Sequence, residues 1–218
     1  MTVTIETVTP RTLGDLLPAL AQVLHACVSQ GASVGFVAPF TAADSEAWWC
    51  RRIAPALEEG GLVLLAARQG GEVVGTVQLD CDTPANQPHR AEVRKLLVHP
   101  RARRAGIARQ LMVAIEASAR ERGRTLLTLD TRSGDHAEPL YLGMGYVVAG
   151  RIPGYARASD ADRLDALRQL DLHDGPDRDL APAPDLGLAV DADGLVGQEL
   201  LGVAAVLDQT GQLEQLAQ

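Results

Sequence analysis

A strand that leads through a short turn into a long amphipathic helix is the feature of this sequence that most restricts its fold. Residues 91–98 form the expected strand, and His99-Pro100 ends it, because proline cannot donate to a strand ladder. Apolar side chains then recur at helical spacing from about Ala105 to Arg122, and Gly123 stops the helix. A strand followed at once by a helix is typical of an α/β protein.

The hydrophobic period switches between strand and helix along most of the chain. Two further helices are predicted before this unit, one from about Thr12 to Ser29 and one capped by Asp44 and ending at Glu59. A short helix, Ala137 to Met144, is predicted after it. The predicted strands are residues 3–8, 62–68, 73–79, 91–98, 125–129 and 146–152. The order β-α-α-β-β-β-α-β-α-β predicts a three-layer α/β fold with a sheet of mixed direction.

The composition changes near residue 157. Up to Arg157 there are 17 Lys and Arg against 15 Asp and Glu, whereas the remainder has 3 against 13 and contains no aromatic residue. A segment with few residues to bury gains little to offset its ordering entropy. We therefore predict a folded domain over residues 1–157 and an acidic extension over 158–218. The leucines of the extension allow two alternatives, short helices or a segment that forms a homodimer.

The composition also limits the partners and the compartment. The longest apolar run, Leu62 to Ala67, is far shorter than the roughly 20 residues of a membrane span, and the N-terminus does not resemble a signal peptide. The three cysteines lack the spacing of a zinc site. The arginines of the turn are confined to one loop, and the tail is acidic, which disfavours nucleic acid. We expect a cytoplasmic protein with no membrane, nucleic-acid or metal partner.

The turn of residues 99–108 predicts an anion site. Backbone N–H groups at a helix N-terminus lack partners, and Gly106 and Ala108 are small enough to allow close approach. Positive charge, which suits a pyrophosphate, comes from Arg101, Arg103 and Arg104. The alternative is a solvated basic edge. Neither a P-loop nor a dinucleotide fingerprint occurs at this turn.

Two motifs at compatible spacing resemble the GNAT (GCN5-related N-acetyltransferase) superfamily. They are Arg103-x-x-Gly106-x-Ala108 after the strand, and Leu140-Tyr141-Leu142-Gly143-Met144-Gly145-Tyr146 some thirty residues later. The resemblance covers about residues 3–156 and implies the three-layer GNAT fold, with a mixed, mostly antiparallel central sheet flanked by helices. The text around Trp48-Trp49-Cys50, Asp130-Thr131-Arg132 and residues 152–156 resembles the bacterial branch that includes the tabtoxin-resistance acetyltransferase.

The resemblance implies acetyl-CoA as co-substrate and no metal. The pantetheine arm would pair with the backbone of the strand while the neighbouring strand splays away, and an amide of Val98 or Leu97 would face the thioester carbonyl. The helix that begins near Ala137 would flank the cofactor. The residues implied for the pantetheine are Leu96, Leu97 and Val98, and those for the pyrophosphate are Arg103, Arg104, Ala105, Gly106, Ile107 and Ala108.

Tyr141 matches the tyrosine that many family members direct at the sulfur of CoA. There the phenol protonates the departing thiolate, so the resemblance makes Tyr141 a general acid as well as a cofactor contact. The alternative is a tyrosine that packs its ring on the sheet beside Leu140 and Tyr146.

Glu92 is the candidate general base. It lies eleven residues before Arg103, the spacing at which the histone acetyltransferase branch of the family places its base glutamate. On an alternating strand, Glu92 and Arg94 share a face with every second residue to Val98, so a structural ion pair is an equal alternative. If Glu92 is not the base, water or Asp80 takes its place.

The second helix borders the acceptor site in members of the family. Adjacent helix residues point about 100 degrees apart, so one of two neighbouring tryptophans can belong to the core while the other lines a cleft. The candidate acceptor contacts, together with Phe40, are Phe36, Trp48, Trp49 and Tyr155.

The C-terminal part departs from the resemblance. Family members end with a further strand, whereas residues 163–170 read as helix or coil without an aromatic or β-branched residue. The final strand is therefore predicted to be atypical or missing, which leaves an exposed sheet edge or one covered by the tail or another subunit. A shifted reading frame near residue 160 would explain the change.

The sequence thus predicts an N-acetyltransferase that moves an acetyl group from acetyl-CoA to a primary amine by direct attack. We expect a small-molecule acceptor, because the first 157 residues are nearly neutral and indicate no peptide groove. A protein N-terminus or lysine is the alternative acceptor. The alternative function is a non-catalytic CoA-binding sensor or interaction protein, in which the incomplete last strand abolishes turnover.

Overall fold

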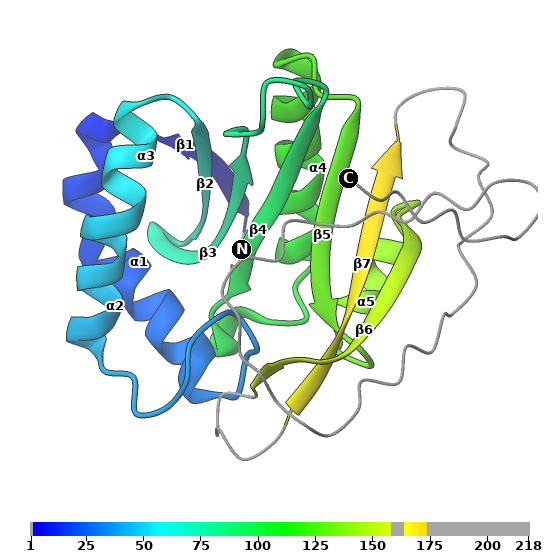
Figure 1. Cartoon of the computed structure of the whole chain (residues 1–218). Helices are drawn as coiled ribbons and strands as arrows, with labels where there is room; N and C mark the ends of the chain where they lie inside the picture. The colour runs from blue at the N-terminus through cyan, green and yellow to red at the C-terminus, as the bar shows by residue number, and fades with distance from the viewer. Residues whose placement is uncertain (1, 158–163, 174–218) are drawn as a thin grey trace, which may run out of the picture. The chain divides into compact units, whose positions relative to one another are not determined.

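A seven-stranded sheet forms the middle layer of the protein in a computed structural model, which describes residues 2–157 and 164–173 (Figure 1). The strand order is β1-β2-β3-β4-β5-β7-β6. Neighbouring strands are antiparallel except β4 and β5, which are parallel. The strands are β1 Val3–Val8, β2 Leu62–Gln69, β3 Glu72–Asp80, β4 Arg90–Val98, β5 Leu126–Arg132, β6 Val147–Arg157 and β7 Leu164–His173. The predicted mixed, mostly antiparallel sheet is confirmed.

Helices cover both faces of the sheet. Helix α1 (Pro10–Ser29) packs on one face with α2 (Ala42–Trp48), a π-helical turn (Trp49–Ile53) and α3 (Ala54–Glu58), which follow one another directly. Helices α4 (Ile107–Glu121) and α5 (Glu138–Leu142) contribute to a second hydrophobic cluster on the opposite face. The predicted three-layer architecture is confirmed.

Helix α1 is long and apolar enough to cross a membrane by length and composition alone. Its buried residues, however, form one stripe that packs in the core with β2 and the helices after it. A helix with one apolar stripe against a sheet is the expected form of a core helix in a globular protein.

Capping boxes begin α1 and α2 on this face. Thr9 caps α1 and exchanges hydrogen bonds with Thr12. Thr41, and not the predicted Asp44, caps α2: the Thr41 hydroxyl accepts from the Asp44 amide, and the Asp44 carboxylate accepts from the Thr41 amide. A carboxylate three residues after a threonine cap is the usual partner in this motif, so the prediction placed the cap three residues late.

The final strand is present although its sequence is atypical, so of the two predicted alternatives, an atypical strand or a missing one, the structure excludes the second. Strand β7 lies between β5 and β6 and pairs with both. Leu170 and Leu172, two residues apart, are 0% and 5% exposed in the core. Local composition favours a helix here, but the free edges of β5 and β6 supply backbone partners on two sides, and this tertiary pairing outweighs local preference.

The sheet therefore continues past residue 157, where composition places the domain boundary. No exposed edge arises beside β5, and the lost strand pattern no longer argues for a shifted reading frame. The remaining residues of the predicted acidic extension, 158–163 and 174–218, lie outside the described residues, as does any helix or dimer segment in them.

Candidate active site

A split opens between β4 and β5, as the resemblance implies. The two strands pair only from Arg90 to Glu92 on β4 and from Leu126 to Thr128 on β5. Beyond these pairs β5 is bonded to β7 alone, and β4 diverges from it (Figure 1). We call the space between residues 93–98 and residues 129–132 the split. Its β4 edge offers backbone groups to a ligand.

A β-bulge lies in β4 beside the split. Thr76 pairs with Leu97 and Gln78 with Arg94, so β4 contains one more residue than β3 over this stretch. Lys95 takes up the extra residue in a left-handed conformation with φ 49, which is rare for a non-glycine side chain. The Thr76 hydroxyl donates to the carbonyl of Lys95 at 3.2 Å and helps to hold the bulge.

The bulge reverses the side of the sheet on which each later side chain of β4 lies. Leu96 and Val98 pack on the α4 side, whereas Leu97 packs on the α1 side. The prediction that Glu92 and Arg94 share a face with Leu96 and Val98 is therefore wrong, because the extra residue shifts the alternation by one position.

The amide of Val98 points into the split. The amide of His99 donates to the carbonyl of Val74 on β3 at 2.8 Å. Successive amides of a strand point to opposite edges, so the Val98 amide faces away from β3 and the Leu97 amide faces toward it. Of the two amides expected to face a thioester carbonyl, the geometry favours that of Val98.

The N-terminus of α4 is built to accept an anion. Gly106 occupies the N-cap position with φ 74, a conformation that favours glycine, and no side chain caps the helix. The amides of the first turn therefore lack intrahelical partners. A Cβ at Gly106 would meet nothing within 4 Å, so backbone conformation and not crowding explains this glycine. These amides at the N-terminus of α4 fit the pyrophosphate of acetyl-CoA.

Two of the three arginines expected to add free charge are engaged elsewhere. Arg101 forms an ion pair with Glu72 at 2.6 Å, and the Nε atom of Arg103 donates to the carbonyl of Val98 at 3.2 Å. Arg103 thus braces the end of β4. Arg104 is exposed and takes a left-handed conformation, φ 68. Side-chain charge for a phosphate is more limited than the sequence suggests.

Tyr141 lies in α5 and is only 6% exposed. Its ring lies 5.8 Å from the ring of Tyr146, centroid to centroid. Burial, reinforced by the carboxylates of Asp135 and Asp130, raises the pKa of Tyr141 above its ordinary range. The phenol therefore carries its proton at neutral pH. Its packing and its proposed role as a proton donor are both compatible with this position.

Glu92, Arg94 and Asp80 form a charged cluster on the α1 side. Arg94 contacts Asp80 at 2.6 Å and Glu92 at 3.5 Å. Burial raises the pKa of Glu92, the Arg94 guanidinium opposes this, and the carboxylates of Asp130 and Asp80 add to it. The ion pair weighed as an alternative exists, and the raised pKa makes Glu92 a better base than an ordinary carboxylate.

Asp130 is a candidate site residue that the sequence motifs do not indicate. It lies two residues after Thr128, the last β5 residue that pairs with β4, and the alternate residues Leu127 and Leu129 pack on the α4 side. Alternation therefore places Asp130 on the same face as Glu92, on the β5 edge of the split. The register of β4 against β5, which no local pattern contains, was needed to find it.

Lys95 is the second residue missed, and it is the only lysine in the sequence. Its ammonium lies 5.6 Å from the ring centroids of both Phe36 and Trp48. Phe36 also packs on Phe40 and Trp48, with centroid distances of 4.6 and 5.4 Å. Burial lowers the pKa of Lys95 to about 8, with the Arg94 charge adding to the effect.

A pocket of about 460 Å³, here the Trp48 pocket, adjoins this cluster. Helix α2, the π-helical turn, α3, the start of β2, the end of β3 and the middle of β4 line it, with residues that include Trp48, Ile53, Leu62, Gln78, Asp82 and Lys95. It contains both apolar walls and charged groups, as small-molecule sites do.

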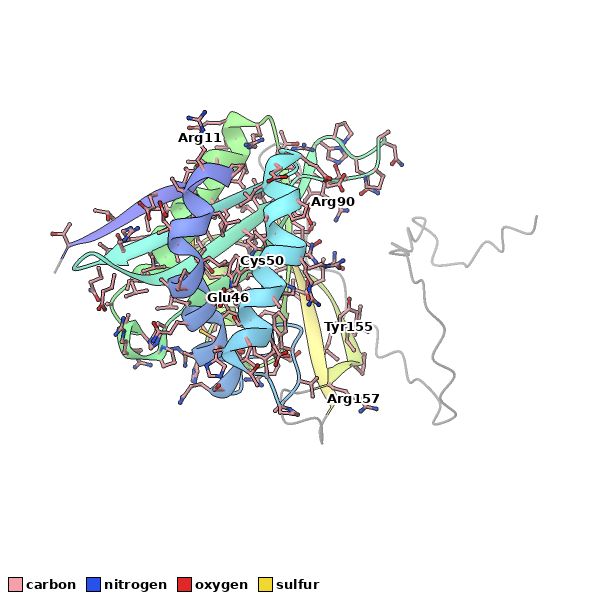
Figure 2. The ribbon with its side chains drawn as sticks, turned by 90° about the vertical axis from the view of Figure 1, so that its left-hand side faces the viewer. Arg11, Glu46, Cys50, Arg90, Tyr155 and Arg157 are labelled. Carbon is pink, nitrogen blue, oxygen red and sulfur yellow. The ribbon has the colours of Figure 1, made fainter. Side chains whose placement is uncertain are left out.

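The four residues expected to contact the acceptor do not all lie at the Trp48 pocket. Trp48 lines the Trp48 pocket, and Phe36 contacts both Trp48 and Lys95. Trp49 is 0% exposed in the core and cannot meet an acceptor, so its assignment is wrong; the pairing of a core and a cleft tryptophan is as expected. Tyr155 is 57% exposed on β6, apart from the helix that carries Cys50 (Figure 2).

Ala137 immediately precedes α5, as the resemblance requires of a residue that flanks the cofactor. It packs against the cluster on the α4 side of the sheet. Within residues 2–157 and 164–173, no group of three or more His, Cys, Asp or Glu side chains is arranged to hold a metal ion.

Comparison with known proteins gives one consistent result. Residues 23–156 match the model of the acetyltransferase (GNAT) domain. An uncharacterized N-acetyltransferase of the hisH-hisA intergenic region of Azospirillum brasilense is 32% identical over 139 residues, which are 63% of this chain and 80% of that protein.

Solved structures agree on the fold. An N-acetyltransferase from Staphylococcus aureus superposes with a TM-score of 0.65 at 18% identity, covering 79% of this chain and 99% of that one. A Salmonella typhimurium protein solved with its cofactor acetyl-CoA has a TM-score of 0.63 at 19% identity, covering 85% of this chain and 99% of that one.

Proposed function

Because this chain belongs to the GNAT acetyltransferase family and is thus an acetyl-CoA-dependent acyltransferase, we propose that it acetylates the primary amine of a small molecule. The observation that carries the proposal is the split between β4 and β5. It has the uncapped N-terminus of α4 at one side and the Trp48 pocket on the α1 face. A donor and an acceptor can therefore approach from different faces of the sheet.

The backbone supplies most of the contacts to the donor. Acetyl-CoA, when bound, supplies an acetyl group activated as a thioester. The first-turn amides of α4 hold the pyrophosphate, and the amide of Val98 donates to the carbonyl oxygen on which negative charge develops. The carbonyl of Val98 accepts from Arg103 and from the thiol of Cys27, which fixes the end of the strand.

Two side chains manage the protons of the transfer. Glu92 accepts a proton from the acceptor ammonium, directly or through water, so that a neutral amine attacks the acetyl carbon. The raised pKa of Glu92 brings its basicity closer to that of the amine. Tyr141 donates its phenolic proton toward the departing thiolate, and its own raised pKa ensures that it carries that proton.

The pocket favours a small acceptor over a protein one. Its volume of about 460 Å³ falls within the roughly 300 to 1,000 Å³ of small-molecule sites. A protein N-terminus or lysine side chain would need an extended groove beside it.

The alternative function, a non-catalytic CoA sensor, is no longer supported. It depended on an incomplete last strand, and β7 is in place.

Calorimetry with acetyl-CoA, followed by assay of thiol release over a panel of amines and peptides, tests the proposal. We expect acetyl-CoA to bind and small amines to release thiol, with peptides inactive. Release with peptides alone would replace the small-molecule acceptor with a protein one. Binding without release by any amine would favour a sensor, and absence of binding would refute the cofactor site.

A further inference from the structure

We propose that Lys95 is the anion-binding residue of the acceptor site, so that the acceptor is an amino acid whose carboxylate lies beside the amine that is acetylated. This inference depends on the proposed function, because it assigns a substrate class to the same site.

Lys95 is held in the acceptor site by the backbone and by aromatic rings. The β-bulge puts it in a left-handed conformation, and its ammonium lies over the rings of Phe36 and Trp48. It also lines the Trp48 pocket. Ring faces attract an ammonium but leave its charge uncompensated by any anion.

A counter-ion in contact with this ammonium is missing from the described part of the chain. Among residues 2–157 and 164–173, no ion pair includes Lys95. Asp130 and Glu92 act on it from a distance, and the neighbouring Arg94 opposes them. Burial without a contacting carboxylate lowers the pKa of Lys95 to about 8. A ligand carboxylate would satisfy this desolvated charge.

The other cations of the pocket are less suited to this task. Arg94 is already bonded to Asp80 at 2.6 Å and to Glu92 at 3.5 Å. Arg52 is exposed, where solvent weakens an ion pair. Lys95 is therefore the group that gains most from an anionic ligand.

Two carboxylates that do not contact Lys95 lie on the same face of the sheet. Glu92 lies opposite Thr128 at the closed end of the split, Asp130 lies on its β5 edge, and both carboxylates attract the ammonium of an acceptor. A cation beside two carboxylates matches a zwitterion. A dianion such as a phosphate monoester would meet one ammonium and repulsion from these carboxylates, so a carboxylate fits better. Trp48, Ile53 and Leu62 offer an apolar wall to the side chain.

The experiment compares L-amino acids with their carboxamides as acceptors. The wild-type protein and Lys95→Met are each assayed with the acid and with the carboxamide, and the ratio of kcat/KM for the acid to kcat/KM for the amide is calculated for each protein. Comparing the two ratios removes the effect of the different basicity of the two amines. We expect Lys95→Met to lower this ratio by about 10- to 100-fold, mainly through KM of the acid, as for loss of a charged hydrogen bond. Lys95→Arg should recover part of it.

Arg51→Met is the matched control, because Arg51 is exposed and does not line the pocket, yet the substitution removes the same charge. It should leave the ratio unchanged. An equal effect of both substitutions would mean a general charge effect and would overturn the inference. An unchanged ratio in an active Lys95→Met protein would do the same.

A second measurement uses the wild-type chain and does not depend on turnover. Because the sequence has a single lysine, ¹³C labelling of the lysine ε-carbon gives one NMR signal from which its pKa is read. N-acetyl-L-leucine, a product-like probe, should raise this pKa, whereas N-acetyl-L-leucinamide should not. The absence of a shift with N-acetyl-L-leucine, and with the N-acetyl derivatives of a small, a charged and an aromatic L-amino acid, would overturn the inference.

Failure of the proposed function is distinguishable from failure of this inference. A protein that binds acetyl-CoA and acetylates only amines without a carboxylate keeps the function and refutes the role of Lys95. A protein that does not bind acetyl-CoA in calorimetry refutes the function itself.

Discussion

Replacing Gly75 with alanine should destabilise the fold and weaken acetyl-CoA binding together. Gly75 lies on β3 opposite Val98. A Cβ added there would lie 2.8 Å from the carbonyl oxygen of Leu97, 3.2 Å from Cδ1 of Leu111 and 3.4 Å from Cγ2 of Ile107. The two side chains can move slightly, but the carbonyl is backbone, so β4 itself must shift at the edge of the split.

The size of the effect follows from this contact. Overpacking costs about 1 to 3 kcal/mol, and the lower chain entropy of unfolded alanine returns about 0.4 to 1 kcal/mol. A net loss of about 1 to 2 kcal/mol corresponds to a fall in Tm of about 2 to 8 °C in a protein of this length. Displacing the Val98 amide loses up to one hydrogen bond, so the Kd for acetyl-CoA should rise by up to about tenfold.

Gly150→Ala provides the control. Gly150 also lies in a strand, and a Cβ there would meet nothing within 4 Å. Thermal unfolding and acetyl-CoA calorimetry are run on the wild type and both variants. Equal stability of the two variants would refute the overpacking argument. Loss of stability in Gly75→Ala with unchanged acetyl-CoA affinity would refute the link between the position of the Leu97 carbonyl and cofactor binding at the β4 edge of the split.

Three further predictions concern the chemistry of the site. Tyr141→Phe should lower kcat by about 100-fold, the usual size of a lost general acid, with the calorimetric Kd for acetyl-CoA unchanged; normal turnover would exclude the role. The pKa of Glu92 is raised above 4.5, so kcat/KM should fall as the pH decreases through this raised pKa. Glu92→Gln should remove this decrease from the pH profile, and a decrease that persists would assign the base to another group. The pKa of Lys95 falls from 10.5 to about 8 on folding, so between these values the unfolded chain binds a proton that the folded chain lacks. The stability of the wild type relative to Lys95→Met, measured by urea unfolding, should therefore rise from pH 8 to pH 10.5 by about 1 to 3 kcal/mol, and a constant difference would contradict the lowered pKa.

The parts of the fold that depend on local pattern were predictable. The period of apolar residues located β4 and α4, and the turn between them has the left-handed Gly106 and uncapped helix start that an anion site requires. These features arise within a few residues of chain, where steric preference and side-chain spacing act directly.

The parts that depend on distant partners were not predictable. Leu170 and Leu172 became part of a strand because β5 and β6 offered them two free edges, against the helical preference of their segment. The sequence predicted that one of two neighbouring tryptophans would line a cleft and the other lie in the core, but only the packing of α2 and the π-helical turn decided that Trp48 lines the pocket and Trp49 lies in the core.

The sequence by itself thus determined the order of the elements up to β6, the turn between β4 and α4 and the family resemblance, because each depends on short-range spacing. Only the tertiary structure decided the face that each residue of β4 presents. One bulge at Lys95, set by pairing with β3, turned Leu96 and Val98 to one side and left Lys95 among Phe36 and Trp48 on the other. A register shift of one residue reverses every later side chain of a strand, and that register belongs to the pair of strands rather than to either alone.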